Sequence, residues 1–167
     1  MLCGEIAACF LDPANGSGSR DSERSRCHPV QETVSDVMQN LLAAFNEHDA
    51  NRVAQICAPN CEVVDVGEAG PLRGREAIKA SCERYLAAFP DLRVEPDVPI
   101  VDGNRGAVAY TVTGSHRGNV LRIPATGKAV TIRGACLVTV HNGQIAQLLT
   151  VWDLAGLLRA IGLLPDL

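Results

Sequence analysis

A carboxylate and an imidazole at the ends of two predicted strands are the side chains best placed for chemistry. In segment 107–116, alternate residues predict one face toward the core, and His116 belongs to that face. In segment 145–152, the same alternation continued by one residue would place the Asp153 carboxylate at the mouth of the same interior. A carboxylate that is removed from water must either accept a hydrogen bond from a donor group or bind a proton, and either state suits acid–base catalysis. We therefore expect a catalytic pair, with Asp153 as base and His116 as its hydrogen-bonding partner.

Both residues also have a purely structural interpretation. Asp153 directly precedes a helical pattern from Leu154 to Ile161, where its side chain would cap the first turn. His116 ends a strand before the turn residue Gly118, and backbone groups would satisfy its ring. Spacing alone leaves both alternatives open.

Further side chains are expected to bind a substrate. Tyr110 and Trp152 flank the two candidates on the same strands, where a ring with a polar tip suits the wall of an apolar cavity. Asp65 alternates with valines, which predicts that it faces outward or lies at the pocket rim. Phe45 and Phe89, each on a helical stripe, complete the predicted substrate-binding set. Ordinary core packing would explain the aromatic rings equally well.

The elements that must position these residues follow a simple order. Apolar spacing of three and four predicts helices over 31–46, from Asp49 to Ile56, over 77–89 and over 154–161. Alternation and β-rich composition predict strands over 61–66, 94–101, 107–116, 129–141 and 145–152, the later ones joined by hairpin turns. Helices followed by antiparallel strands predict an α+β fold, and the sequence has no glycine-rich phosphate loop.

Composition limits the organisation and the partners. The 167 residues, 47% of them apolar, suit one domain over 30–167, and the Ser- and Arg-rich segment 1–29 is expected to be a flexible tail. The net charge of −4, without a basic cluster, disfavours nucleic acid as a partner. No apolar run reaches the roughly 20 residues of a membrane span, and we expect no secretion signal.

Cysteine usage indicates a compartment and argues against a metal site. The seven cysteines are odd in number and scattered, which favours a reducing, cytoplasmic environment over a disulfide framework. Cys57 and Cys61 have no second Cys or His pair at zinc-finger spacing, so we expect no metal. The sequence also has no Gly-x-Ser-x-Gly nucleophile elbow.

Several short segments together resemble one known family. They are Phe89-Pro90-Asp91-Leu92, Gly114-Ser115-His116-Arg117-Gly118, Ile123-Pro124-Ala125-Thr126-Gly127-Lys128, Asn142-Gly143-Gln144-Ile145, Trp152-Asp153 and Leu157-Leu158-Arg159-Ala160-Ile161-Gly162. In order and spacing over residues 33–165, the chain resembles the SnoaL-like polyketide cyclases of the nuclear transport factor 2-like superfamily.

The resemblance implies a fold and an activity. It implies a cone-shaped, curved antiparallel sheet packed on three N-terminal helices, with a short C-terminal helix, an apolar cavity and usually a homodimer. It also implies that Asp153 is the acid–base catalyst of an intramolecular aldol closure, that His116 assists it, and that neither a cofactor nor a metal is needed. This chain departs from the family pattern at Ser115, Ala160 and Tyr110, where Thr, Gln and Trp respectively are more usual.

Three functions follow from these expectations. The first is a cyclase or isomerase that removes a proton next to a carbonyl of an apolar small molecule. The second is a non-catalytic domain of the same fold that binds a small molecule or dimerises, with Asp153 only as a helix cap. The third is an epoxide hydrolase, which in this fold uses an Asp–Arg–Asp set that the sequence does not assemble convincingly.

Overall fold

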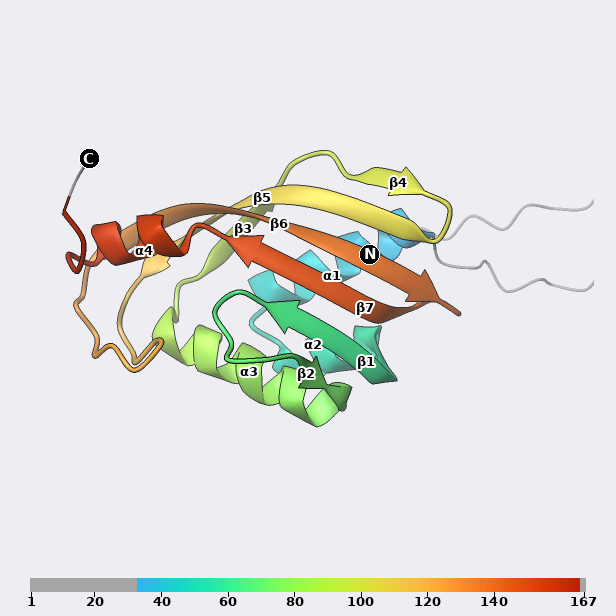
Figure 1. The fold of residues 1–167 in the computed structure, drawn as a ribbon, viewed down its shortest axis with the longest axis horizontal. Helices are drawn as coiled ribbons and strands as arrows, with labels where there is room; N and C mark the ends of the chain where they lie inside the picture. Colours follow the sequence, from blue (N-terminus) through green and yellow to red (C-terminus); the bar gives the residue numbers. More distant parts are fainter. Residues whose placement is uncertain (1–32, 166–167) are drawn as a thin grey trace, which may run out of the picture.

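The helices come first along the chain and pack against one face of a curved sheet. A computed structural model describes residues 33–165 (Figure 1). Its helices are α1 (Val34–Asn46), α2 (Ala50–Ile56), α3 (Gly74–Ala88) and α4 (Leu154–Ala160). Its strands are β1 (Cys57–Asp65), β2 (Leu72–Arg73), β3 (Arg93–Pro96), β4 (Ile100–Asp102), β5 (Arg105–Ser115), β6 (Ala129–His141) and β7 (Gln144–Trp152). The tail expected over residues 1–29 lies outside the described residues.

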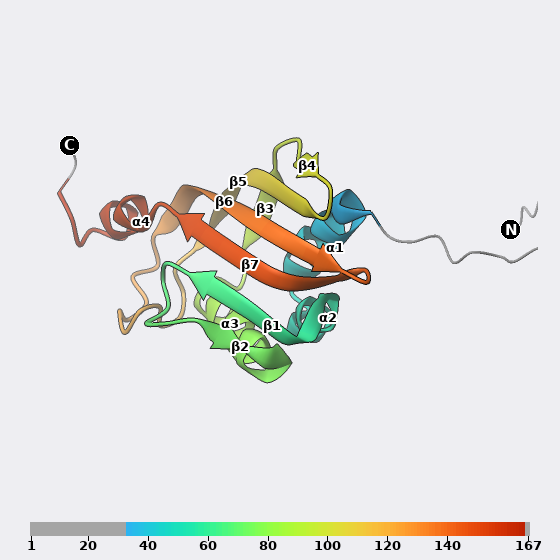
Figure 2. The same ribbon diagram turned by 45° about the vertical axis from the view of Figure 1, so that its right-hand side comes forward.

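The sheet is mixed and does not close into a barrel. Its strand order is β2-β1-β7-β6-β5-β3, and β4 pairs with β5 (Figure 2). Every pair is antiparallel except β1 and β7, which run parallel because α3 and the later strands, not a hairpin, connect them. The predicted α+β fold is confirmed, and the expected antiparallel sheet contains this one parallel pair.

Local chemistry explains where the elements begin and end. Thr33 and Asp36 form a capping box, so α1 starts at Val34; residues 31 and 32 of the predicted helix lie outside the described residues. Asp49 accepts a hydrogen bond from the Arg52 N–H and caps α2, as predicted. The single strand predicted over 94–101 is divided into β3 and β4, because the prolines at 96 and 99 supply no N–H to the sheet.

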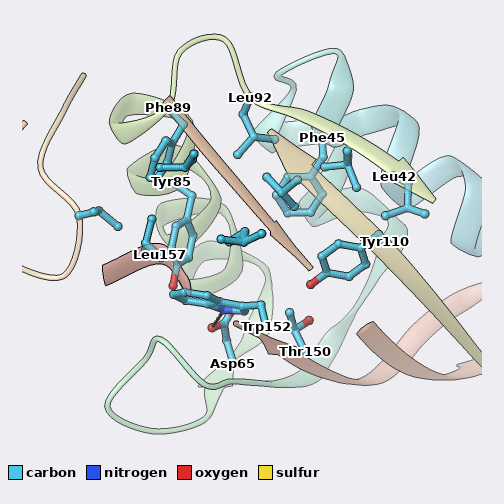
Figure 3. Close-up of a pocket in the computed structure, with 15 residues that line it drawn as sticks. Leu42, Phe45, Asp65, Tyr85, Phe89, Leu92, Tyr110, Thr150, Trp152 and Leu157 are labelled. Carbon is cyan, nitrogen blue, oxygen red and sulfur yellow. Dashed lines mark hydrogen bonds between the residues drawn. The ribbon is translucent and has the colours of Figure 1, made fainter. Parts of the chain in front are cut away.

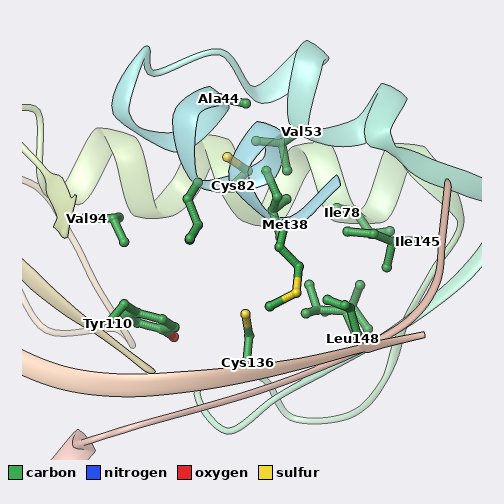
Figure 4. Packing of buried hydrophobic residues seen from close by; sticks show 14 of the residues in the cluster. Met38, Ala44, Val53, Ile78, Cys82, Val94, Tyr110, Cys136, Ile145 and Leu148 are labelled. Atoms are coloured by element: carbon green, nitrogen blue, oxygen red, sulfur yellow. The ribbon is translucent and has the colours of Figure 1, made fainter. Parts of the chain in front are cut away.

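The core lies between the helices and the inner face of the sheet (Figure 4). Val37 and Met38 of α1 are almost completely buried, and Met38 points toward Cys136 and Leu148 of the strands (Figure 4). Each such side chain contributes about 1.5–3 kcal/mol of burial free energy. None of the described helices is long and apolar enough to cross a membrane.

One extra residue in β7 decides which of its side chains face the core. Thr139 pairs with Gln147, but Val140 pairs with Ile145, which leaves Ala146 as a bulge. Beyond the bulge the inward residues are even-numbered: Leu148 is 9% exposed, whereas Leu149 is 39% exposed. The expectation that Leu149, Val151 and Asp153 share the core face of Ile145 is therefore wrong, because a bulge shifts the alternation by one.

In β5 the predicted alternation is confirmed. Val108 and Tyr110 are buried, and His116, just beyond the strand, is completely buried. No bulge interrupts the pairing of β5 with β6, so the alternation persists along the whole strand.

Candidate functional site

An apolar cavity of about 140 Å³ lies between the helices and the inner face of the sheet (Figure 3). An engineered cavity of about 150 Å³ in another protein binds benzene, so this one has room for about one ring. Its lining residues are Leu42, Phe45, Asp65, Tyr85, Phe89, Leu92, Val94, Tyr110, Val112, Val120, Val130, Ile132, Thr150, Trp152 and Leu157.

Asp65 is the one charged residue among the described lining residues. It ends β1, and its Oδ1 accepts hydrogen bonds from Trp152 Nε1 at 2.9 Å and from the Gly67 N–H at 2.7 Å (Figure 3). Its Oδ2 accepts no hydrogen bond from the described residues. The carboxylate is thus held through one oxygen, and the other is available to a ligand.

The Tyr85 hydroxyl reaches the same end of the cavity from α3. Its ring meets the Trp152 ring edge-on, with centroids 6.5 Å apart (Figure 3). Its Oη is buried, lies beside the Asp65 carboxylate and makes no hydrogen bond of ordinary geometry to the described residues. Burial, reinforced by the nearby Asp65 and Glu68 carboxylates, raises the pKa of Tyr85, so the hydroxyl keeps its proton at neutral pH.

Tyr110 supplies a second hydroxyl on the opposite wall. Its ring lies over Gly134 of β6, where a methyl group would come within 2.6 Å of the ring. Burial also raises the pKa of Tyr110, which keeps this hydroxyl protonated. Thr150 of β7 lines the cavity between Asp65 and Tyr110 (Figure 3).

His116 is completely buried but does not line the cavity. Its Nδ1 lies 3.1 Å from Thr126 Oγ1, and its ring packs on Phe89 with centroids 5.5 Å apart. Its backbone N–H donates to the Lys128 carbonyl, and its carbonyl accepts from the Gly127 N–H. These contacts hold together the two ends of the loop that joins β5 to β6.

The segment around His116 also fastens this loop to the end of α3. Asp91 accepts hydrogen bonds from both the N–H and the hydroxyl of Ser115, each at 2.7 Å. The N–H groups of Arg117 and Gly118 donate to the Ala88 carbonyl at 2.9 and 3.0 Å. The loop positioned in this way carries Val120, which lines the cavity.

Asp153 lies outside the cavity. It is exposed, and its Oδ1 accepts a hydrogen bond of 2.7 Å from the Gly156 N–H, which caps α4. The bulge in β7 gives the inward position to Trp152 and turns the next residue toward solvent. The structure therefore does not bring Asp153 and His116 together, and their catalytic roles stay a prediction.

The structure does bring the expected substrate-binding residues together. Tyr110, Trp152, Asp65, Phe45 and Phe89 all line the one cavity, and their binding of a substrate stays a prediction. The described lining includes no arginine, so the Asp–Arg–Asp set of an epoxide hydrolase is not assembled there.

Two polar lining residues, Tyr85 and Thr150, are not among the site residues predicted from the sequence. Tyr85 lies four residues before Phe89 on the same helical stripe, and that spacing was a signal that both rings face one interior. Thr150 carried no such signal, because the β7 bulge reverses the alternation that would have located it.

Comparison with known proteins adds to this geometry. The family model for the SnoaL-like polyketide cyclase matches residues 35–161. The chain belongs to this family. None of the curated proteins compared by sequence matches it.

Solved structures resemble the chain across most of its length. TsrD from Streptomyces laurentii is 28% identical, with a TM-score of 0.71 over 78% of this chain and 96% of its own. AclR from Streptomyces galilaeus is 24% identical, with a TM-score of 0.71 over 80% and 87%. IdmH from Streptomyces antibioticus, described as a candidate polyketide cyclase, is 24% identical, with a TM-score of 0.69 over 78% and 99%. This SnoaL-like chain thus has the nuclear transport factor 2-like, or ketosteroid isomerase-like, fold.

Proposed function

We propose that this SnoaL-like protein is a cofactor-independent cyclase or isomerase that removes a proton from the carbon next to a carbonyl, with Asp65 as the base. The observation that carries the proposal is the Asp65 carboxylate at the end of an otherwise uncharged cavity. Two N–H groups fix its Oδ1 and leave Oδ2 for the substrate. A carboxylate that is fixed at the end of an apolar cavity is well suited to general base catalysis.

The chemistry proceeds through an enolate. Asp65 takes the proton, and the C–H electron pair moves toward the carbonyl oxygen. In a ring closure, the enolate carbon then attacks a second carbonyl of the same molecule and forms the new C–C bond. The alkoxide that results takes the proton back from Asp65, so the protein ends in its starting state.

This proposal assigns the base differently from the sequence expectation. Asp65 lines the cavity, whereas Asp153 is exposed and caps α4. The catalytic roles of Asp153 and His116 stay predictions, and the exchange measurement below tests that of Asp153.

Hydrogen–deuterium exchange measures the first step without knowledge of the natural substrate. The full chain is incubated in deuterated buffer with single-ring ketones and 1,3-diones, and loss of the α-proton signal is followed by NMR. The wild-type protein should accelerate the exchange, and Asp65→Asn should lower the protein-dependent rate by about 10²-fold or more.

Asp153→Asn is the matched control, because asparagine also caps helices well. It should exchange at the wild-type rate. A rate loss in Asp153→Asn with none in Asp65→Asn would return the base to the position expected from sequence. Tight binding of these ketones without exchange in the wild type would favour the non-catalytic binding domain.

We also propose that the chain forms a homodimer through the outer face of the sheet. Five apolar residues there are direct cross-strand neighbours, one on each of β1, β7, β6, β5 and β4: Val64, Leu149, Leu137, Ala107 and Ile100. Four of them expose between 39% and 75% of their surface. An apolar row of this length on an exposed sheet face favours contact with a second, identical row.

A further inference from the structure

We propose that Cys57 and Cys61 form a reversible disulfide bond when the protein meets hydrogen peroxide, so that the start of β1 is a redox-modification site. Neither cysteine lines the cavity. The proposal therefore depends neither on the role of Asp65 nor on the proposed activity.

The pairing of β1 with β7 brings the two cysteines close together. Cys57 pairs with Ile145 and Glu62 pairs with Gln147, so five steps along β1 correspond to only two steps along β7. The extra residues of β1 form a bulge. In a regular strand the four steps from Cys57 to Cys61 would span about 13 Å, whereas two steps span about 6.5 Å. The bulge thus shortens the distance between the two Cα atoms toward the roughly 4.4–6.8 Å that a disulfide requires.

Burial indicates that both thiols point to the same side of the bulge. Cys57 and Cys61 are completely buried, whereas Pro59 and Asn60 between them are exposed. The Cys57 thiol donates a hydrogen bond to Cys61 Sγ, so the two side chains are already in contact. An exposed segment opens locally at low cost, which gives a small oxidant access to the pair.

The surroundings favour ionisation of one thiol of the pair. The hydrogen bond from Cys57 lowers the pKa of Cys61 and raises the pKa of Cys57, which keeps its proton. Arg75 of α3 donates from Nε to the Cys57 carbonyl at 2.8 Å, which holds a positive charge beside the pair. Arg75 forms no ion pair with the described carboxylates. Because thiolates react with peroxides and nearby cations stabilise thiolates, Cys61 is the residue that we expect to react first.

The oxidation is balanced in two steps. The Cys61 thiolate attacks one oxygen of hydrogen peroxide, the O–O bond breaks, and a sulfenic acid and hydroxide form. The Cys57 sulfur then attacks the Cys61 sulfur, the S–O bond breaks, and the hydroxyl group leaves as water with the Cys57 proton. The hydroxide takes up the proton that Cys61 released. Two thiols thus lose two electrons and two protons, and the peroxide becomes two water molecules. A thiol reductant reverses the reaction by exchange.

Peptide mapping of the full chain tests the site. The native protein is treated with hydrogen peroxide at pH 7, and the remaining thiols are alkylated with N-ethylmaleimide in denaturant. Trypsin then cuts after Arg52 and Arg73, so that Cys57 and Cys61 are the two cysteines of one peptide. We expect this peptide to lose both alkyl labels and to be two hydrogen atoms lighter than its reduced, unlabelled form. Treatment with dithiothreitol before alkylation should restore both labels.

Cys136 is the matched control within the same molecule, because it is also buried and free, and burial raises its pKa to about 11. It should lose its label at least about tenfold more slowly than the pair. In Cys57→Ala, Cys61 lacks its hydrogen-bond donor and should react at least about threefold more slowly than in the wild type. A pair that keeps its labels as long as Cys136, or a peptide that gains oxygen without losing hydrogen, would overturn the proposal whether or not this variant folds. An unchanged Cys61 rate in the folded variant would also overturn it.

Discussion

At Gly67, the absence of a side chain leaves space on which the site depends. The residue follows β1, donates its N–H to Asp65 Oδ1, and lies against Tyr85 Oη and the Trp152 ring. A side chain there would occupy the place where the carboxylate, the hydroxyl and the indole meet. The site is therefore organised by a small residue as much as by its polar groups.

Replacing Gly67 by alanine should displace Tyr85 or Trp152. The added methyl would lie closer to both than van der Waals contact allows, at 2.5 and 2.6 Å. We expect a loss of about 1–3 kcal/mol in the free energy of unfolding, measured with urea. Gly70→Ala is the control: the same loop has open space there, so stability should change by less than about 0.5 kcal/mol. Equal stability losses in the two variants would contradict this account.

At the scale of elements, the family segments around Asp91 and Ser115 act as a joint. Asp91 follows α3, and Ser115 ends β5, so their two hydrogen bonds connect a helix terminus to a strand terminus. The same joint carries the loop with Val120, a wall of the cavity. These segments support the site through architecture, with no direct contact between Asp91 and the cavity.

The joint should make stability depend on pH. Hydrogen bonds from the Ser115 N–H and hydroxyl hold the pKa of Asp91 below its ordinary value. Its contribution is therefore present above about pH 4, the pKa of an unfolded Asp, and is lost as the pH falls through the lower folded pKa. Asp91→Asn should lower the free energy of unfolding at pH 7 and flatten its decline below about pH 5. The free energy of unfolding is measured by urea titration across this pH range for the wild type, for Asp91→Asn and for the exposed control Asp102→Asn. A parallel decline in all three proteins would contradict the prediction.

At the scale of the whole molecule, the sheet has two apolar faces with different occupants. Helices α1 to α3 cover the inner face (Figure 1). The outer face carries the row from Val64 to Ile100 without cover in the described chain. The proposed homodimer gives this row a partner and leaves the cavity within each subunit.

A charge placed in the middle of the row should separate the subunits. Leu137 is 44% exposed and lies directly opposite Leu149, so Leu137→Glu puts a carboxylate at the centre of the proposed contact. Light scattering after size-exclusion chromatography should give a dimer for the wild type and a monomer for this variant. Val98→Glu is the control, because Val98 is 87% exposed and outside the row. A monomeric wild type, or a Leu137→Glu protein that remains dimeric, would refute the proposed interface.

The sequence predicted the fold better than the arrangement of the site. Helix stripes and the β5 alternation are local patterns, and the structure confirms them at Val37, Tyr110 and His116. The parallel pairing of β1 with β7 depends on residues more than eighty positions apart, which no local pattern encodes. The inward position of the half-buried Trp152 and the exposure of Asp153 depend on a bulge that leaves no clear mark in composition.

The bulge at Ala146 decides which face of the sheet each later side chain of β7 points to. Successive side chains of a strand alternate between the two faces of the sheet, and the bulged residue shifts that alternation by one for the rest of β7. A chain of the same length whose β7 paired regularly with β6 through Ala146, without the bulge, would turn the Asp153 carboxylate inward and the Trp152 indole outward. Two related proteins can therefore share the same Trp-Asp pair and differ in which of its two side chains faces the core. Whether β7 contains a bulge between the hairpin turn and that pair thus decides which of the two side chains faces the cavity.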